Sequence, residues 1–191
     1  SAAPAADVLA RLAACKVVPV IKLNDAAHAV PLCKALQAGG LDVAEITFRT
    51  SCAAAAMREV SKHLASNVLV GAGTVLTPTQ VDMAIEAGAD FIVSPGIDPA
   101  VAKRCRLRKV LYLPGVVTPT EIMRASSEFK LTALKFFPAG NYGGVGTLKS
   151  FSAVFPEISF MPTGGVTESN VHDYVSLPNV IAAGGTWMVG E

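Results

Sequence analysis

Short apolar runs alternate with longer amphipathic segments along nearly the whole chain. The apolar runs are too short for buried helices and too short to span a membrane, and several are rich in the β-branched residues that favour strands. They predict eight strands, at residues 17–21, 43–49, 68–71, 91–93, 110–113, 131–136, 158–161 and 180–182.

The segments between these runs carry the spacing and the end signals of helices. TPTQ (77–80) and TPTE (118–121) have the form of capping boxes with proline at the first helical position, and Asp98 precedes Pro99 in the same way. We therefore expect helices at residues 5–14, 25–38 and 52–64, after Thr77, after Asp98, after Thr118, at 145–154, and at 168–174 with Thr167 as the cap.

Regular alternation of strand and helix with short connections is typical of parallel βα units. Eight such units predict an α/β protein with a single (β/α)8 TIM barrel domain over residues 1–191, preceded by a short N-terminal helix. An open doubly wound sheet is the alternative, weakened because no GxGxxG follows the first strand. Only residues 183–191 follow the eighth run, so we expect the last helix to be missing or its groove to be covered by another chain.

The amino-acid composition argues against several classes of function. The net charge of +1 gives no basic surface for nucleic acid or for an acidic membrane. A hydrophobic content of 51% and a mean hydropathy of +0.46 favour a doubly covered sheet or subunit interfaces. The four cysteines form no CxxC pattern, which favours reduced thiols in a cytoplasmic protein. The three histidines do not cluster, so we expect no metal site built from them. We also expect no cofactor.

One predicted strand, LTALKFFP (131–138), carries a single lysine, Lys135, between apolar neighbours. Burial of an ammonium ion favours the neutral amine, which is a nucleophile toward carbonyl groups. The alternative is an ordinary lysine at a strand end whose amine reaches water past its neighbours.

The second strand carries three polar residues at alternate positions, Glu45, Thr47 and Arg49. The period of a strand places them on one face, toward the barrel interior. Such an arrangement is unfavourable unless a ligand uses it. The alternative is an internal glutamate–arginine pair that satisfies itself.

In a barrel the chemistry lies at the carboxyl ends of the strands, and several ends carry suitable residues. Double glycines follow the seventh and eighth strands, each beside a hydroxyl residue. Phosphate commonly binds at this place in barrels through backbone amides, although a double glycine can also be an ordinary turn. The residues at these ends are Thr74, Pro95, Thr163, Gly164, Gly165, Gly184, Gly185 and Thr186.

A lysine, a carboxylate and anion-binding groups suit covalent carbonyl chemistry. An iminium formed on the lysine withdraws electrons and makes a neighbouring C–C bond cleavable, while the carboxylate moves protons. The rivals are a barrel that binds a phosphorylated metabolite without catalysis, and an epimerase or a thiazole-phosphate type of synthase. The latter would require a second acid–base group or a metal cluster.

The order of motifs along the chain resembles that of the 2-keto-3-deoxy-6-phosphogluconate (KDPG) aldolases, a family also known as 4-hydroxy-2-oxoglutarate (KHG) aldolases. The resemblance covers essentially the whole chain, and the combination is highly specific. The motifs are VPVI (18–21), EITFRT (45–50), GAGTVL (71–76), SPG (94–96), PG (114–115), LKFFPA (134–139) and PTGG (162–165).

The resemblance implies a class I aldolase on a (β/α)8 barrel, usually a cytoplasmic homotrimer of the Entner–Doudoroff pathway that produces pyruvate and glyceraldehyde 3-phosphate. It implies that Lys135 forms the Schiff base and that Glu45 is the acid–base, working through a water. Arg49 and Thr74 would bind the pyruvate carboxylate. Thr163 would contact the C4 hydroxyl, and the phosphate would bind Gly164, Gly165, Gly184, Gly185 and Thr186.

Pro95 and Phe137 belong to the SPG and LKFFPA motifs and are expected to line the same site. The family's GGS is GGT (184–186) here, which keeps the hydroxyl and adds a methyl group. The family also continues into a terminal helix beyond this sequence. Residue patterns do not separate the gluconate from the galactonate substrate, so the 2-keto-3-deoxy-6-phosphogalactonate aldolases stay as an alternative.

Overall fold

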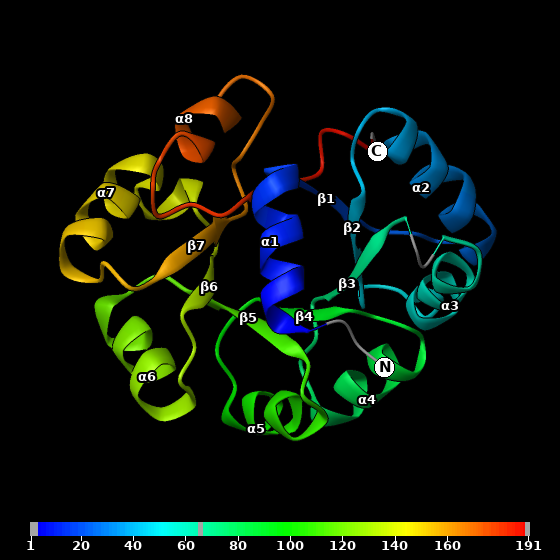
Figure 1. The fold of residues 1–191 in the computed structure, drawn as a ribbon, viewed down its shortest axis with the longest axis horizontal. Helices are drawn as coiled ribbons and strands as arrows, with labels where there is room; N and C mark the ends of the chain where they lie inside the picture. Colours follow the sequence, from blue (N-terminus) through cyan, green and yellow to red (C-terminus); the bar gives the residue numbers. More distant parts are fainter. Residues whose placement is uncertain (1–3, 65–66, 190–191) are drawn as a thin grey trace.

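A computed structural model describes residues 4–64 and 67–189. Figure 1 shows a ring of strands surrounded by helices, with the first helix lying across one end of the ring. The strands are β1 Val17–Ile21, β2 Val43–Thr47, β3 Leu69–Gly73, β4 Phe91–Ser94, β5 Leu111–Val116, β6 Ala133–Phe136, β7 Ser159–Pro162 and β8 Ala183–Gly185.

The helices follow the strands in alternation, which confirms the βα pattern. They are α1 Ala5–Cys15, α2 Ala29–Ala38, α3 Ala53–Leu64, α4 Pro78–Glu86, α5 Pro99–Arg108, α6 Pro119–Phe129, α7 Gly144–Val154 and α8 Val171–Val175, with short 3-10 helices at Ala26–His28 and Gly140–Tyr142.

The eight strands form one parallel sheet in the order β7-β6-β5-β4-β3-β2-β1-β8. Strands β1 to β7 each pair with their neighbours in the sequence, and β1 also pairs with β8 through Val17 and Ala183. Isolated bridges from Phe160 to Val180 and from Thr163 to Gly184 connect β7 to the β8 segment and bring the two edges of the sheet together. The predicted (β/α)8 barrel is therefore confirmed.

Helix α1 covers the end of the barrel where the strands begin. Its Val8 and Leu12 are fully buried and pack with Val18, Phe91 and other apolar residues inside the ring. Figure 1 shows α1 in front of the ring of strands. Because α1 covers this end, we expect a site at the opposite end, where the strands finish.

Several predicted boundaries were wrong, and for the eighth strand the reason is its pairing with distant strands. The eighth strand covers 183–185 rather than 180–182, because Ala183 pairs with β1 while Val180 bridges to Phe160. The last helix is α8, Val171–Val175, and its N-cap is Asn170 rather than Thr167. The second strand ends at Thr47, so Arg49 lies in the following turn.

Of the two predicted capping boxes, one is complete and the other forms only one of its two hydrogen bonds. Thr118 and Glu121 form both bonds of the box at the start of α6. At the start of α4 the Thr77 side chain accepts from Gln80 N, but the Gln80 side chain accepts from Leu76 N and not from Thr77 N. The prediction of a full box at residues 77–80 was therefore wrong in this bond.

All four cysteines are free. Burial raises the pKa of Cys33 to about 11, and burial together with nearby Asp82 raises the pKa of Cys105 to about 12. Both thiols therefore stay protonated at neutral pH and act as small apolar core residues. Within residues 4–64 and 67–189, no helix has the length and apolar character needed to cross a membrane.

The carboxylate of Asp98 caps α5 by accepting from Ala100 N at 2.9 Å and from Val101 N at 2.8 Å. Replacing Asp98 with alanine leaves both amides without this acceptor, so we expect the free energy of unfolding to fall by about 1 kcal/mol. Urea titration followed by circular dichroism measures the change. As a control, replacing the exposed Glu168 should change it by less than about 0.5 kcal/mol. Equal midpoints for the two variants would contradict the capping role.

Candidate active site

A cavity of about 290 Å³ lies at the carboxyl ends of the strands. It combines residues from β1, β2, β6 and β8 and from the turns after β2, β3, β4, β6, β7 and β8. A groove of about 380 Å³ beside α1 is larger, but its charged residues are all exposed at the other end of the strands. The smaller cavity is lined by Val20, Glu45, Thr47, Arg49, Thr74, Pro95, Lys135, Phe137, Thr163, Gly164, Gly165, Val166, Gly185 and Thr186.

The structure brings nearly all predicted site residues into this one cavity. Gly184 is the exception among them. It lies within β8, and a Cβ at this position would come within 2.6 Å of the Thr163 hydroxyl oxygen. Gly184 therefore allows β8 to approach the end of β7, while Gly185 and Thr186 reach the cavity.

At the base of the cavity, Lys135 and Glu45 form a buried ion pair. The Lys135 Nζ lies 3.6 Å from Glu45 Oε1, and the two residues are 6% and 0% exposed. Among the residues that the structure describes, neither carboxylate oxygen has a hydrogen-bond partner. A buried carboxylate normally has its acceptor capacity satisfied, so this one has capacity left for a bound molecule.

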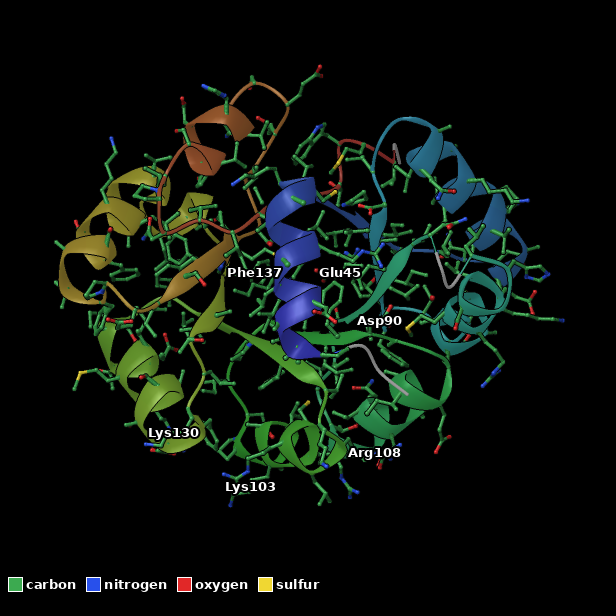
Figure 2. The ribbon with its side chains drawn as sticks, in the orientation of Figure 1. Glu45, Asp90, Lys103, Arg108, Lys130 and Phe137 are labelled. Carbon is green, nitrogen blue, oxygen red and sulfur yellow. The ribbon has the colours of Figure 1, made fainter. Side chains whose placement is uncertain are left out.

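The amine of Lys135 also lies 5.0 Å from the centre of the Phe137 ring. The ring supplies an apolar wall and attracts the ammonium form through its negative face. Figure 2 shows Glu45 and Phe137 toward the middle of the ring of strands, whereas Lys103, Arg108 and Lys130 lie at the outside. The glutamate–arginine pair that the sequence left open is not the one observed, because the ionic partner of Glu45 is Lys135.

Gly73, which was not among the predicted site residues, leaves the space that the Glu45 carboxylate occupies. Residues 47 and 73 are paired across β2 and β3, and a Cβ on Gly73 would lie 2.3 Å from Glu45 Oε1. Any larger residue would therefore displace the carboxylate. The signal in the sequence was the glycine of the GAGT motif, which predicts a tight loop equally well.

Arg49 and Thr74 flank the cavity on the side of β2 and β3. Arg49 Nε donates to the Thr47 hydroxyl at 3.0 Å. Thr74 has a φ of 57°, a left-handed conformation that is uncommon for a β-branched residue. A guanidinium and a hydroxyl at one edge of a small cavity are suited to a carboxylate ligand.

The turn after β7 forms the opposite edge. Gly164 and Gly165 have φ values of 85° and 79°, which are favourable for glycine alone. Within the part of the chain that the structure describes, no group accepts from the amides of these two residues. The Thr163 hydroxyl is also buried without a partner. Free amides and a hydroxyl at a glycine turn form a suitable cradle for an anion.

Val20, Thr47 and Val166 line the cavity and were not among the predicted site residues. The sequence does not mark Val20 and Val166 as site residues, because an apolar residue looks like any core residue. Thr47 was placed on the correct face but given no role. The described residues contain no group of three His, Cys, Asp or Glu side chains that could hold a metal ion.

The geometry can support nucleophilic attack on a carbonyl carbon. The amine and the carboxylate are close enough to exchange a proton through a bound molecule, and anion-binding groups lie on two opposite edges. A substrate with a carboxylate near its carbonyl and a second anionic group at its far end fits this arrangement.

Comparison with known proteins identifies the family of the chain. The family model "KDPG and KHG aldolase" matches residues 8–191. The 2-dehydro-3-deoxy-phosphogluconate aldolase of Treponema pallidum is 44% identical over 91% of this chain and 82% of its own length. The KHG/KDPG aldolase of Escherichia coli K12 is 42% identical over 91% of this chain and 80% of its own length.

Solved structures agree with the fold. A KDPG aldolase of Legionella pneumophila, described with pyruvate captured at low pH as a covalent carbinolamine intermediate, has a TM-score of 0.91 and 39% identity, and the match covers 96% of this chain and 88% of that one. The family model matches most of the sequence, two relatives are more than 40% identical, and the barrel is shared with a solved structure. This chain belongs to the KDPG and KHG aldolase family.

Proposed function

We propose that this chain is a class I aldolase that cleaves 2-keto-3-deoxy-6-phosphogluconate to pyruvate and glyceraldehyde 3-phosphate. The observation that carries the proposal is the buried Lys135–Glu45 pair, whose carboxylate keeps its full hydrogen-bonding capacity beside an open cavity. A non-catalytic binding barrel would need neither group, and burying both without a use is unfavourable.

In the proposed reaction, Lys135 Nζ attacks the C2 ketone and forms a carbinolamine. Loss of water gives an iminium. Glu45, directly or through a water, removes the proton from the C4 hydroxyl, and the C3–C4 bond breaks as its electron pair moves toward the iminium nitrogen. This step releases glyceraldehyde 3-phosphate and leaves an enamine. Protonation at C3 and hydrolysis then release pyruvate and regenerate the amine.

The two edges of the cavity bind the two ends of this substrate. Arg49 and Thr74 hold the carboxylate at C1, which fixes the ketone over Lys135. Thr163 contacts the C4 hydroxyl, Pro95 and Phe137 line the middle of the site, and the phosphate binds at Gly164, Gly165, Gly185 and Thr186, with Gly184 shaping that end.

The same groups suit 4-hydroxy-2-oxoglutarate, whose second carboxylate replaces the phosphate. We place the gluconate substrate ahead of the galactonate epimer because the relatives above 40% identity have gluconate names, whereas the structure described as native KDPGal is 28% identical. We further propose that residues 1–191 form one domain that works in the cytoplasm as a homotrimer. The exposed apolar side chains of Leu107, Met123 and Val154 support contact between subunits.

A direct assay tests the proposed reaction. Purified protein is mixed with 2-keto-3-deoxy-6-phosphogluconate, and the pyruvate released is measured with lactate dehydrogenase and NADH. The galactonate epimer and 4-hydroxy-2-oxoglutarate are compared at equal concentration. We expect the highest kcat/KM with the gluconate. Release of pyruvate at the rate of a blank without the protein would contradict the proposal.

Gly73 offers a steric test of the role of Glu45. A Cβ at this position would lie 2.3 Å from Glu45 Oε1, so Gly73→Ala should displace the carboxylate and lower kcat by about 10- to 100-fold. The matched control is Gly96→Ala, since a Cβ there would meet no atom within 4 Å, and it should keep the parent kcat. Equal kcat values for the two variants in the pyruvate-release assay would show that the position of Glu45 does not depend on Gly73.

A further inference from the structure

Thr47 connects the end of β2 to Arg49 through its side chain, and the reaction steps above do not involve it. Its hydroxyl oxygen lies 2.8 Å from the carbonyl oxygen of Ile21 and 3.0 Å from Arg49 Nε. The residue is 2% exposed, so water does not compete for these bonds.

The direction of both hydrogen bonds follows from their chemistry. A carbonyl oxygen only accepts, and the Nε–H of a guanidinium only donates. A hydroxyl has one proton, which here goes to Ile21, so its lone pair accepts from Arg49. The strand end of β1 thereby orients the hydroxyl, and the hydroxyl orients the guanidinium.

Arg49 has little other polar support. It lies in the turn after β2, its side chain is exposed, and within residues 4–64 and 67–189 the Thr47 hydroxyl is the one group that accepts a hydrogen bond from it. A long side chain in a turn samples many rotamers unless a bond holds it. Because the bond uses Nε, both Nη groups stay free for the two oxygens of a ligand carboxylate.

We propose that Thr47 is a positioning residue that fixes the Arg49 guanidinium for the carboxylate of the substrate. This inference rests on the proposed function, in which Arg49 binds that carboxylate. The carboxylate is bound in the ground state and in the transition state alike, so loss of its orientation affects KM more than kcat.

The decisive variant is Thr47→Val, which keeps the shape of the side chain and removes the hydroxyl. We expect it to raise the KM for 2-keto-3-deoxy-6-phosphogluconate by about tenfold and to change kcat by less than about twofold. Thr47→Ser restores the hydroxyl and should return KM most of the way to the parent value. If the valine variant does not fold, Thr47→Ala removes the same hydroxyl and should show the same rise in KM.

Thr50 provides the matched control. Thr50 follows Arg49 in the chain, and its hydroxyl donates to the carbonyl oxygen of Leu23 at 2.6 Å. This hydroxyl has no hydrogen bond to Arg49. Thr50→Val therefore removes a similar link between the ends of β1 and β2 and should leave KM unchanged.

A double-mutant cycle separates positioning from general stabilisation. Arg49→Ala should raise KM by about 100-fold, and adding Thr47→Val to it should change KM by less than about twofold further, because there is no guanidinium left to orient. Multiplicative effects in the double variant, or an unchanged KM in Thr47→Val, would overturn the inference while the parent protein still cleaves the substrate. A parent protein without cleavage would overturn the proposed function and this inference with it.

Discussion

Replacing Lys135 with alanine should lower kcat/KM for 2-keto-3-deoxy-6-phosphogluconate by about five orders of magnitude. Without the amine there is no iminium to accept the electron pair of the C3–C4 bond, and the remaining groups only bind the substrate. Removal of the lysine also leaves the Glu45 carboxylate buried without its ionic partner, which destabilises the fold.

Lys135→Arg distinguishes the chemical effect from the structural one. A guanidinium keeps a positive charge near Glu45 but is protonated at neutral pH and does not condense with a ketone. This variant should therefore be as inactive as Lys135→Ala, but its denaturation midpoint should lie closer to that of the parent protein. The exposed Lys149 on α7 serves as the control, and Lys149→Ala should keep the parent kcat/KM. Activity of the arginine variant within about tenfold of the parent would exclude an obligatory Schiff base.

Glu45→Gln should give the second largest loss, a fall in kcat of about 10³-fold. The amide keeps the size of the carboxylate but does not take a proton from the C4 hydroxyl. Iminium formation with pyruvate should continue, because Lys135 is still present. The most specific readout is the exchange of the methyl protons of pyruvate for deuterium, followed by proton NMR, since this exchange needs the base but no aldehyde.

The exposed Glu157 provides the control for this experiment, and Glu157→Gln should exchange the pyruvate protons at the parent rate. An exchange rate in Glu45→Gln equal to that of the parent would remove Glu45 from the proton-transfer steps. Loss of both exchange and iminium formation would instead assign Glu45 to the activation of Lys135.

The fold was predictable because each strand is a short apolar run and each helix has local end signals. Asp98 and Thr118 begin their helices where the sequence placed them, since capping depends on near neighbours alone. The end of the barrel was less predictable. The eighth strand pairs with β1, which lies at the other end of the sequence. The hydrophobic pattern does not show whether residues 180–182 or 183–185 make this pairing.

The charged centre of the site was also predictable, because a lysine and a glutamate in buried strands are rare enough to be informative. The supporting residues were not. Gly73 matters because the side chain of Glu45, on the neighbouring strand, fills the space beside it. Thr47 matters because its hydroxyl accepts a hydrogen bond from Arg49, which lies in a turn and not in the strand that the sequence predicted. Both roles arise only when β1, β2 and β3 are assembled.

The central claim is that Lys135 forms an iminium with pyruvate. The protein is incubated with pyruvate and sodium borohydride, digested, and analysed by peptide mass spectrometry. We expect one reduced pyruvyl adduct, on the peptide that contains Lys135, and none in Lys135→Arg. A folded protein that cleaves the substrate without this adduct, or with the adduct on another lysine, would contradict the account.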